Sequence, residues 1–431
     1  MTTASHATKR VFLFLQGPHG PFFHQLSQQL RTAGARVWRV GFNAGDSVFW
    51  PDKKTYIPYR DNPEKWAETF EDILKEKRVT DLALYGDART IHSQAIKIAK
   101  ARGLRVHIFE EGYLRPYWIT YERDGSNGNS ELMDLSIDDM DFAQQTYSFD
   151  APVPPSHWGD LRQHVFYGAL YHWFVMTCNH GYPAFQPHRA LTVSEEFRLY
   201  IKRLGLMPLH AVDRRIASLR VKLGKFPYHL ALLQLEHDAS FQTHGPFTKQ
   251  AEFAEAVLSG FAAGAPSHHH IVFKAHPLED GRSPLRSDIR RLAKKYGLTG
   301  RVHFIGGGKL AALLDEARTA VTVNSTAGQQ ALWRGVPLKI FGTCVYDKDL
   351  LISRQKLVDF FAAPKRNDPK AYRIFRDFLL STSQIPGSFY ASRGRRQLLR
   401  RIGDLMLLPV GPYELARPKS EAVRQHIYLV R

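Results

Sequence analysis

Two short segments in the second half of the chain combine side chains that bind phosphate or carboxylate groups. Each follows an apolar run typical of a buried strand. The residues concerned are Lys274, His276, Pro277, Asn324, Ser325 and Thr326. Lysine supplies a point charge, imidazole and hydroxyl groups hydrogen-bond, and a helix starting at Ser325 or Thr326 would offer free backbone N–H groups. The pattern predicts an anion site at the ends of two neighbouring strands. The alternative is that residues 324–326 only cap a helix.

Two adjacent carboxylates end an apolar run in the first half of the chain. Glu110 and Glu111 precede a glycine, and Arg115 follows closely. A carboxylate at a strand end can act as a base or nucleophile in group transfer. Successive strand residues face opposite ways, so we expect only one of the two, Glu111, to face a ligand. Glu122 and Asp124 are alternative catalytic carboxylates. Arg115 either holds an anion or forms a structural ion pair.

Three further residues lie in loops that follow predicted strands. They are His19 in QGPHG, and Asp87 and Arg89 in YGDAR. Carboxyl ends of strands in open α/β sheets are where ligands bind, so we consider all three as candidates for an acceptor or cleft site. The glycines around His19 lack the GxGxxG spacing, and a tight turn explains them equally well.

The sequence gives little support for a metal or a cofactor. Cys178 and Cys344 are too few for a disulfide framework or a structural zinc site, and they are typical of buried thiols in a reducing compartment. Residues 268–270 are consecutive histidines, which cannot all face one ion, so we expect a solvated turn there. The acidic triplets at 139–141 and 347–349 are expected at the surface. We predict no metal and no cofactor.

The composition indicates a globular protein with an anionic partner. The 431 residues are 44% hydrophobic and carry 59 Lys and Arg against 41 Asp and Glu, a formal charge of +18. A net charge of +10, from 16 basic and 6 acidic residues, lies after Ser353. No apolar run is long enough to cross a membrane, and residues 1–10 lack a signal core. The aromatic segment 164–179 and the basic end both suit an anionic membrane surface.

Predicted strands alternate with predicted helices, which favours parallel sheets. The strands expected from the apolar runs are 11–15, 37–40, 81–85, 106–109, 229–235, 271–275, 302–305, 320–323 and 338–341. The helices expected are 22–33, 66–77, 92–101, 249–261, 286–296, 310–316 and 326–334. We therefore expect two Rossmann-like domains, 1–190 and 191–352, and a basic helical tail, 353–431, that packs back on the domains or on a membrane.

The motifs resemble those of a known family. KAHP followed by VNSTAGQQAL is similar to the donor-binding pair of bacterial sialyltransferases and Kdo transferases, which use CMP-activated sugars. LQGPHGPFF, YGDARTIH and FEEGYLRPYWITYERDGSNGNS resemble segments of the KpsS-type (LipB-type) capsule polysaccharide proteins. The resemblance spans residues 11 to about 341.

The resemblance implies a GT-B fold, with two Rossmann-like domains facing a central cleft and C-terminal helices. It also implies a retaining β-Kdo transferase that moves Kdo from CMP-Kdo onto a phosphatidylglycerol-type lipid and so starts a poly-Kdo linker for a capsule chain. His276 would contact the CMP phosphate, and Ser325 with Thr326 would bind the phosphate or the sugar carboxylate, with Lys274 as counter-charge. A nucleoside monophosphate can leave with help from fixed positive groups alone, without a metal.

The resemblance also covers a segment between the two domains' main motifs. Gln234, Asp238 and His244 match family positions, but Ala239, Ser240 and Gly245 depart from the family pattern. These three candidates therefore either bind a ligand or only line the cleft.

The expected setting is the cytoplasmic face of the inner membrane. There the partners would be a CMP-sugar donor, an anionic lipid acceptor, and possible contacts with a KpsC-type transferase and the capsule export complex. The alternatives are another CMP-sugar transferase of the sialic acid type, a non-catalytic export partner and a polyanion-binding protein. Nucleic acid is not an expected partner, since the sequence contains no known binding module.

Overall fold

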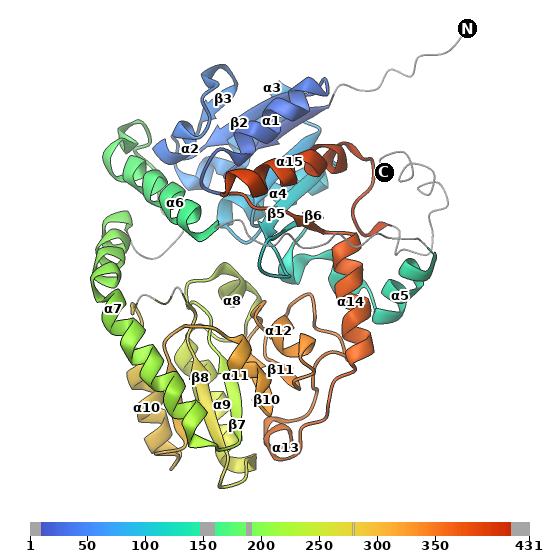
Figure 1. Ribbon diagram of the computed structural model, residues 1–431. Coiled ribbons are helices and arrows are strands. Elements are labelled where there is room, and N and C mark those ends of the chain that lie inside the picture. The colour runs from blue at the N-terminus through green and yellow to red at the C-terminus, as the bar shows by residue number, and fades with distance from the viewer. Residues whose placement is uncertain (1–9, 147–159, 187–191, 278, 280, 415–431) are drawn as a thin grey trace. The chain divides into compact units, whose positions relative to one another are not determined.

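The computed structural model describes residues 10–146, 160–186, 192–277, 279 and 281–414, and it consists of two compact units (Figure 1). Unit 1 comprises Met1–Leu132, Phe142–Val193 and Phe378–Arg431. Unit 2 comprises Met133–Asp141 and Ser194–Asp377. This division differs from the predicted boundaries at residues 190 and 352. The residues after 352 are shared between the units, with the change at Phe378.

Unit 1 is built on a seven-stranded sheet in the order β12-β6-β5-β4-β1-β2-β3. The strands are β1 (Val11–Phe14), β2 (Arg36–Gly41), β3 (Tyr56–Pro58), β4 (Asp81–Tyr85), β5 (Arg105–Glu111), β6 (Trp118–Arg123) and β12 (Gln384–Pro386). β1 to β5 are parallel, whereas β6 is antiparallel to β5 and β12 is antiparallel to β6. Helices α1 (Phe22–Thr32), α2 (Ala44–Val48), α3 (Trp66–Lys77), α4 (Thr90–Ala101), α6 (Asp160–Thr177) and α15 (Ser392–Leu407) belong to the same unit.

The two faces of this sheet bury separate apolar clusters. Phe14 and Phe109 face α1 and α15, where Leu398 and Ile402 complete the cluster. The alternate residues of the same strands, such as Leu13 and Ile108, pack on the other face with residues of α3 and α4. This alternation is the period of two that buried strands require. The basic C-terminal segment thus contributes both an edge strand, β12, and core residues to unit 1.

Unit 2 contains a five-stranded parallel sheet in the order β11-β10-β7-β8-β9. The strands are β7 (Tyr228–Leu232), β8 (His270–Lys274), β9 (Val302–Ile305), β10 (Thr319–Thr322) and β11 (Leu338–Ile340). Its helices are α7 (Val193–Gly224), α8 (Ala239–His244), α9 (Gln250–Gly264), α10 (Leu285–Lys295), α11 (Ala311–Asp315), α12 (Gly328–Trp333) and α13 (Leu357–Ala362). Two more helices, α5 (Ile137–Thr146) and α14 (Pro369–Ser381), run across the boundaries between the units.

Two Rossmann-like units in one chain confirm the predicted α/β, GT-B-like fold class. Within the described residues, no helix combines the length and apolarity that a membrane crossing requires. That the two domains face each other across a cleft stays a prediction.

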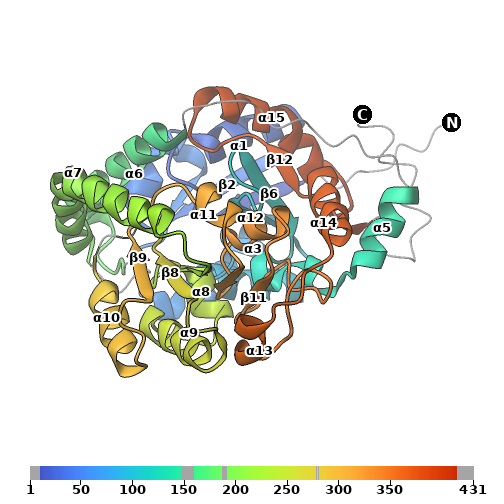
Figure 2. The same ribbon diagram turned by 60° about the horizontal axis from the view of Figure 1, so that its bottom comes forward.

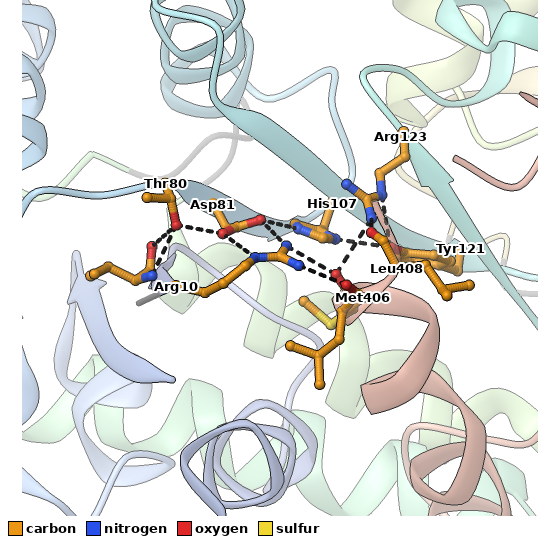
Figure 3. A network of polar contacts seen from close by, with 10 residues as sticks. Arg10, Thr80, Asp81, His107, Tyr121, Arg123, Met406 and Leu408 are labelled. Carbon is orange, nitrogen blue, oxygen red and sulfur yellow. Dashed lines mark hydrogen bonds and ion pairs between the residues drawn. The ribbon is translucent and has the colours of Figure 1, made fainter. Parts of the chain in front are cut away.

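A buried polar network ties the start of the unit 1 strands to the end of α15 (Figure 3). Asp81 accepts hydrogen bonds from Arg10 Nε at 2.9 Å and from Thr80 Oγ1 at 2.6 Å. His107 Nε2 lies 3.0 Å from Asp81 Oδ1, and His107 Nδ1 lies 2.9 Å from the Tyr121 hydroxyl. Burial lowers the pKa of His107 to about 3, so the imidazole is neutral. It therefore donates to Asp81 and accepts from Tyr121.

Two arginines extend this network to the last carbonyl groups of α15. Arg10 donates to the carbonyls of Met406 and Leu407 at 3.0 Å each, and Arg123 donates to that of Leu408 at 3.1 Å. These carbonyls have no partners within the helix and form its negative end, so cations there stabilise it. The network thus fixes the end of α15 against the amino-terminal ends of β1 and β4.

Two minor predictions are right only in part. His268 lies exposed in a turn, as expected, but His269 is buried and bonds to His229 at 3.1 Å, and His270 begins β8 and stacks on Phe226 at 3.8 Å. Imidazole and phenyl rings can pack together in a core once the imidazole is neutral. Cys178 is exposed, whereas Cys344 is buried as expected.

Candidate functional site

The end of β8 holds a buried lysine that has no carboxylate partner among the described residues. Lys274 is only 5% exposed, and its single hydrogen bond, to the carbonyl of Ala275, is long at 3.5 Å. Burial, together with the nearby charge of Arg214, lowers the pKa of Lys274 to about 8. Within the described residues, neither Lys274 nor Arg214 forms an ion pair. A buried cation with a second, half-buried cation nearby is costly, so this place is suited to an anion.

A glycine loop after β9 lies beside these two cations. Gly307 and Gly308 have φ angles of 75° and 86°, which favour glycine. A Cβ on Gly308 would lie 2.8 Å from the Arg214 side chain, and one on Gly307 would lie 3.4 Å from Cα of Pro277. The loop therefore packs closely between α7 and the His276–Pro277 turn. His276 is half-buried there, and Pro277 is exposed.

The strand order corrects one expectation about this site. β8 and β10 are not neighbours, because β7 lies between them. Gln234, which follows β7, joins the end of β7 to that of β10. Its side chain donates to Asn324 Oδ1 at 2.8 Å and accepts from Asn324 N at 3.0 Å. Asn324 also donates to the carbonyl of Ser240 at 2.8 Å. The hydrogen-bonding groups of both buried side chains are thus used within the protein, so these two residues position the ends of β7 and β10.

Ser325 and Thr326 lie in a turn before α12 and not at its first residue. α12 begins at Gly328, and the backbone N–H of Ala327 bonds to Ser325 Oγ at 3.2 Å. Both side chains are half-buried. A hydroxyl that accepts one bond can still donate, so Ser325 stays a candidate ligand residue. The expectation of a helix starting at Ser325 or Thr326 is wrong, because the turn precedes the first helical hydrogen bonds.

The segment after β7 holds the two remaining unit 2 candidates. Asp238 is exposed and caps α8 by accepting from Ser240 N at 3.1 Å. His244 ends α8 and is half-buried. Its carbonyl accepts from Thr343 N at 2.8 Å, so α8 is tied to the segment after β11. Asp238 thus stabilises the start of α8. A ligand role for His244 stays a prediction.

In unit 1, the paired carboxylates lie on opposite faces of β5, as the strand period requires. Glu111 shares the face of Phe109, and the Tyr85 hydroxyl lies 3.4 Å from its Oε1. Glu110 points to the other face, where a Cβ on Gly86 would come within 3.1 Å of its Oε1. Both carboxylates belong to the strand itself, because β5 extends to Glu111 and pairs with β6. Both are half-buried.

Arg115 and Glu122 have very different surroundings. Arg115 is exposed and donates to the carbonyl of Gly112 at 3.2 Å within its own loop. Glu122 lies on β6, is 0% exposed, and accepts hydrogen bonds from Tyr113, Ser130 and Tyr413. Burial raises the pKa of Glu122 to about 8. A carboxyl enclosed by three hydroxyl groups is a structural element of unit 1, which leaves Glu111 as the better candidate for catalysis.

Glu122→Gln is expected to change the pH dependence of stability. The folded pKa of about 8 exceeds the ordinary value of 4.5, so the wild type loses stability as the pH rises between these values. The amide does not titrate, and the variant should lack this loss of about 1.4 kcal/mol per pH unit. Urea unfolding at pH 6 and pH 8 measures it. An identical pH dependence in both proteins, or a folded variant without activity, would contradict the structural role.

The loops after β1 and β4 bring His19 and Arg89 into one cluster. Arg89 donates to Gln16 Oε1 at 3.2 Å, and Gln16 Nε2 lies 3.4 Å from the Tyr171 hydroxyl. His19 stacks on the Tyr171 ring at 4.2 Å. Tyr171 comes from α6, so the aromatic segment packs partly on this loop.

Asp87 is separate from that cluster and is nearly buried. It accepts from Ser126 N at 2.9 Å and from Asn129 Nδ2 at 3.1 Å. Asp87 therefore stabilises the loop after β6 through these two hydrogen bonds, which is a structural role.

Sequence reasoning missed Arg214 and Tyr171. Arg214 is one of several arginines in a long amphipathic helix, and only the folded chain brings it to Lys274. The glycine run at 306–308 was the available signal, because consecutive glycines after a strand indicate close backbone packing. Tyr171 lay in a segment that was interpreted only as aromatic.

The sheet ends of unit 2 thus form a candidate anion site in a Rossmann-like unit. The family model described as capsule polysaccharide biosynthesis protein matches residues 80–390. The chain belongs to this family. It is 30% identical over 383 residues to the Escherichia coli capsule polysaccharide export protein KpsS, covering 88% of this chain and 97% of that protein.

Two further similarities accompany this result. The capsule polysaccharide modification protein LipB of Neisseria meningitidis serogroup B is 31% identical over 390 residues, covering 88% of this chain and 91% of LipB. Among solved structures, the Thermosulfurimonas dismutans KpsC beta Kdo 2,7 transferase is 13% identical, with a TM-score of 0.44, covering 91% of this chain and 99% of that one.

Proposed function

We propose that the protein is a glycosyltransferase of capsule polysaccharide assembly that takes Kdo from CMP-Kdo and places it on a phosphatidylglycerol-type or lysophosphatidylglycerol-type lipid. The observation that carries the proposal is the pair of nearby cations Lys274 and Arg214 at the strand ends of unit 2, which has no counter-ion among the residues that the structure describes. A CMP-sugar with a carboxylate brings two negative groups to such a place. Membership of the capsule family supports a sugar donor, and the KAHP and VNSTAG motifs support CMP-Kdo.

Each residue has a definite task in this proposal. Lys274 and Arg214 neutralise the donor's phosphodiester, and His276 donates a hydrogen bond to the phosphate oxygen that becomes the leaving group. Ser325 and Thr326 hold the phosphate or the sugar carboxylate. Fixed cations stabilise the departing monophosphate, so no metal and no cofactor are part of the proposal.

Unit 1 supplies the acceptor side and the catalytic carboxylate. Glu111 is the base or nucleophile, and a nucleophile would form the covalent intermediate of a retaining transfer. His19, Arg89 and Arg115 are candidates for the lipid phosphate. Peripheral binding to the cytoplasmic face of the inner membrane fits the lipid acceptor. The exposed aromatic residues of α6, Phe166 at 60% and Trp173 at 50%, are compatible with such binding.

The direct experiment incubates the full chain with CMP-Kdo and a fluorescent lysophosphatidylglycerol and follows the product by mass spectrometry. We expect addition of Kdo, its continuation in the presence of a chelator, and its loss in His276→Ala. A parallel reaction with CMP-sialic acid separates the other CMP-sugar transferases. No transfer from either donor by folded protein would contradict the proposal and favour a non-catalytic partner of a KpsC-type transferase or of the export complex.

A further inference from the structure

Helix α7, the long helix labelled in Figures 1 and 2, also has a row of exposed apolar residues. Their sequence positions alternate in steps of three and four, which places them along one side of the helix. The residues are Leu209, Val212, Ile216, Leu219 and Leu223, and their exposures lie between 47% and 72%. We call this set the α7 stripe. Isolated exposed leucines are ordinary, but five aligned along one helix face mark an interaction site.

The α7 stripe faces away from the unit to which the helix belongs. The opposite side of α7 is the packed side, where Val221 is 4% exposed and Arg214 contacts the glycine loop. The stripe is therefore not the buried face of an ordinary amphipathic helix. It is a second apolar face on the same helix, directed outward.

Cations flank the α7 stripe on both sides. Arg215 and Lys222 lie along one edge and Arg220 along the other, and all three are exposed. The acidic residue near the stripe, Asp213, forms an ion pair with Arg286 at 3.0 and 3.1 Å, which neutralises it. The edges of the stripe are thus positive. A helix with an apolar face bordered by Lys and Arg is typical of binding in the plane of an anionic bilayer surface.

We propose that the α7 stripe docks on an anionic lipid surface, with its apolar side chains in the headgroup and acyl boundary and its flanking cations at the phosphates. Long basic side chains can extend to the phosphates while their stems stay in the apolar layer. A second copy of the chain suits the stripe less well, because parallel pairing of two α7 helices would set arginine against arginine at the flanks. The proposal extends the lipid acceptor of the proposed function to a docking surface, and it rests on that function only for the choice of lipid.

The test measures binding of the full chain to vesicles by flotation, without any sugar donor, so that it is independent of transferase activity. Vesicles of phosphatidylcholine alone are compared with vesicles that also contain phosphatidylglycerol. We expect Leu219→Ser with Leu223→Ser to weaken binding to the anionic vesicles by about tenfold or more. Arg215→Gln with Lys222→Gln should weaken it by about fivefold per cation and remove the preference for phosphatidylglycerol.

The control replaces two exposed apolar residues of unit 2 outside α7, Leu350→Ser with Val358→Ser, which are 50% and 42% exposed. This variant should bind like the wild type. Equal binding by the wild type and the stripe variant would overturn the proposal. A wild-type dimer that the stripe variant dissociates would identify a second copy as the occupant. A large loss of thermal stability in the stripe variant, with vesicle binding intact, would show that the stripe is covered by this chain itself. Both results would also overturn it.

Discussion

Asp81→Ala is expected to lower the free energy of unfolding by about 3–5 kcal/mol. The carboxylate is 0% exposed and accepts hydrogen bonds from Arg10, Thr80 and His107. Its removal leaves the guanidinium partly buried without its counter-charge and the His107 N–H without an acceptor. Because the same arginine caps α15, hydrogen exchange in α15 should also become faster.

The pH dependence separates this effect from a general loss of packing. Hydrogen bonds from His107 and Arg10 hold the pKa of Asp81 well below its usual value of 3.8 despite burial. A lowered folded pKa stabilises the protein above the ordinary pKa, and this stabilisation is lost as the pH falls toward the folded value. Asp81→Asn should remove that acid dependence. Asp72→Ala, with a 74% exposed side chain, is the control. An Asp81→Ala stability within about 0.5 kcal/mol of this control would contradict the network's role.

Lys274→Met is expected to reduce affinity for CMP by about 100-fold or more and to keep or raise the stability of the protein. The lysine is buried near Arg214 and has no anionic partner among the described residues, so a side chain of similar volume and no charge removes an unfavourable interaction. The nucleotide phosphate, by contrast, loses a charge-assisted contact in a site shielded from water. The affinity for CMP is therefore expected to fall while the stability of the protein is kept or rises.

A second buried lysine of unit 2 supplies the matched control. Lys348 is 8% exposed and donates to the carbonyl of Met133 at 2.9 Å, a shorter hydrogen bond than the 3.5 Å one of Lys274 to Ala275. Lys348→Met should lower stability and leave CMP affinity unchanged. Calorimetric titration with CMP and thermal unfolding of both variants measure the contrast. Unchanged CMP affinity in Lys274→Met, or a fall in stability as large as that of Lys348→Met, would contradict the anion site.

Local patterns predicted most regular elements closely. The predicted helix at 66–77 and the strands at 81–85 and 302–305 match α3, β4 and β9. These elements can be predicted because the spacing of their apolar residues within a short window indicates a helix or a strand. The segments that were missed depend on distant partners. β12 exists because Gln384 pairs with Thr120 across 264 positions of sequence. Nothing near Gln384 marks a strand.

The candidate site, like the fold, could be predicted from the sequence only in part. The residue types of KAHP and VNSTAG sufficed to predict an anion site, since charge and hydrogen-bonding capacity are properties of the side chains themselves. Spacing could not choose between Glu111 and Glu122. That choice required burial, which encloses Glu122 among hydroxyl groups from three segments of chain.

The sequence by itself determined the α/β class, the excess of positive charge and the presence of anion-binding side chains at strand ends, because periodicity and composition are local properties. Only the tertiary structure decided that β7 separates β8 from β10, that Arg214 stands beside Lys274, and that the basic C-terminal segment completes unit 1. The physical reason is that strand order, burial and the pairing of charges are set by contacts between residues far apart in the chain, where the net gain of each contact depends on what else is packed around it.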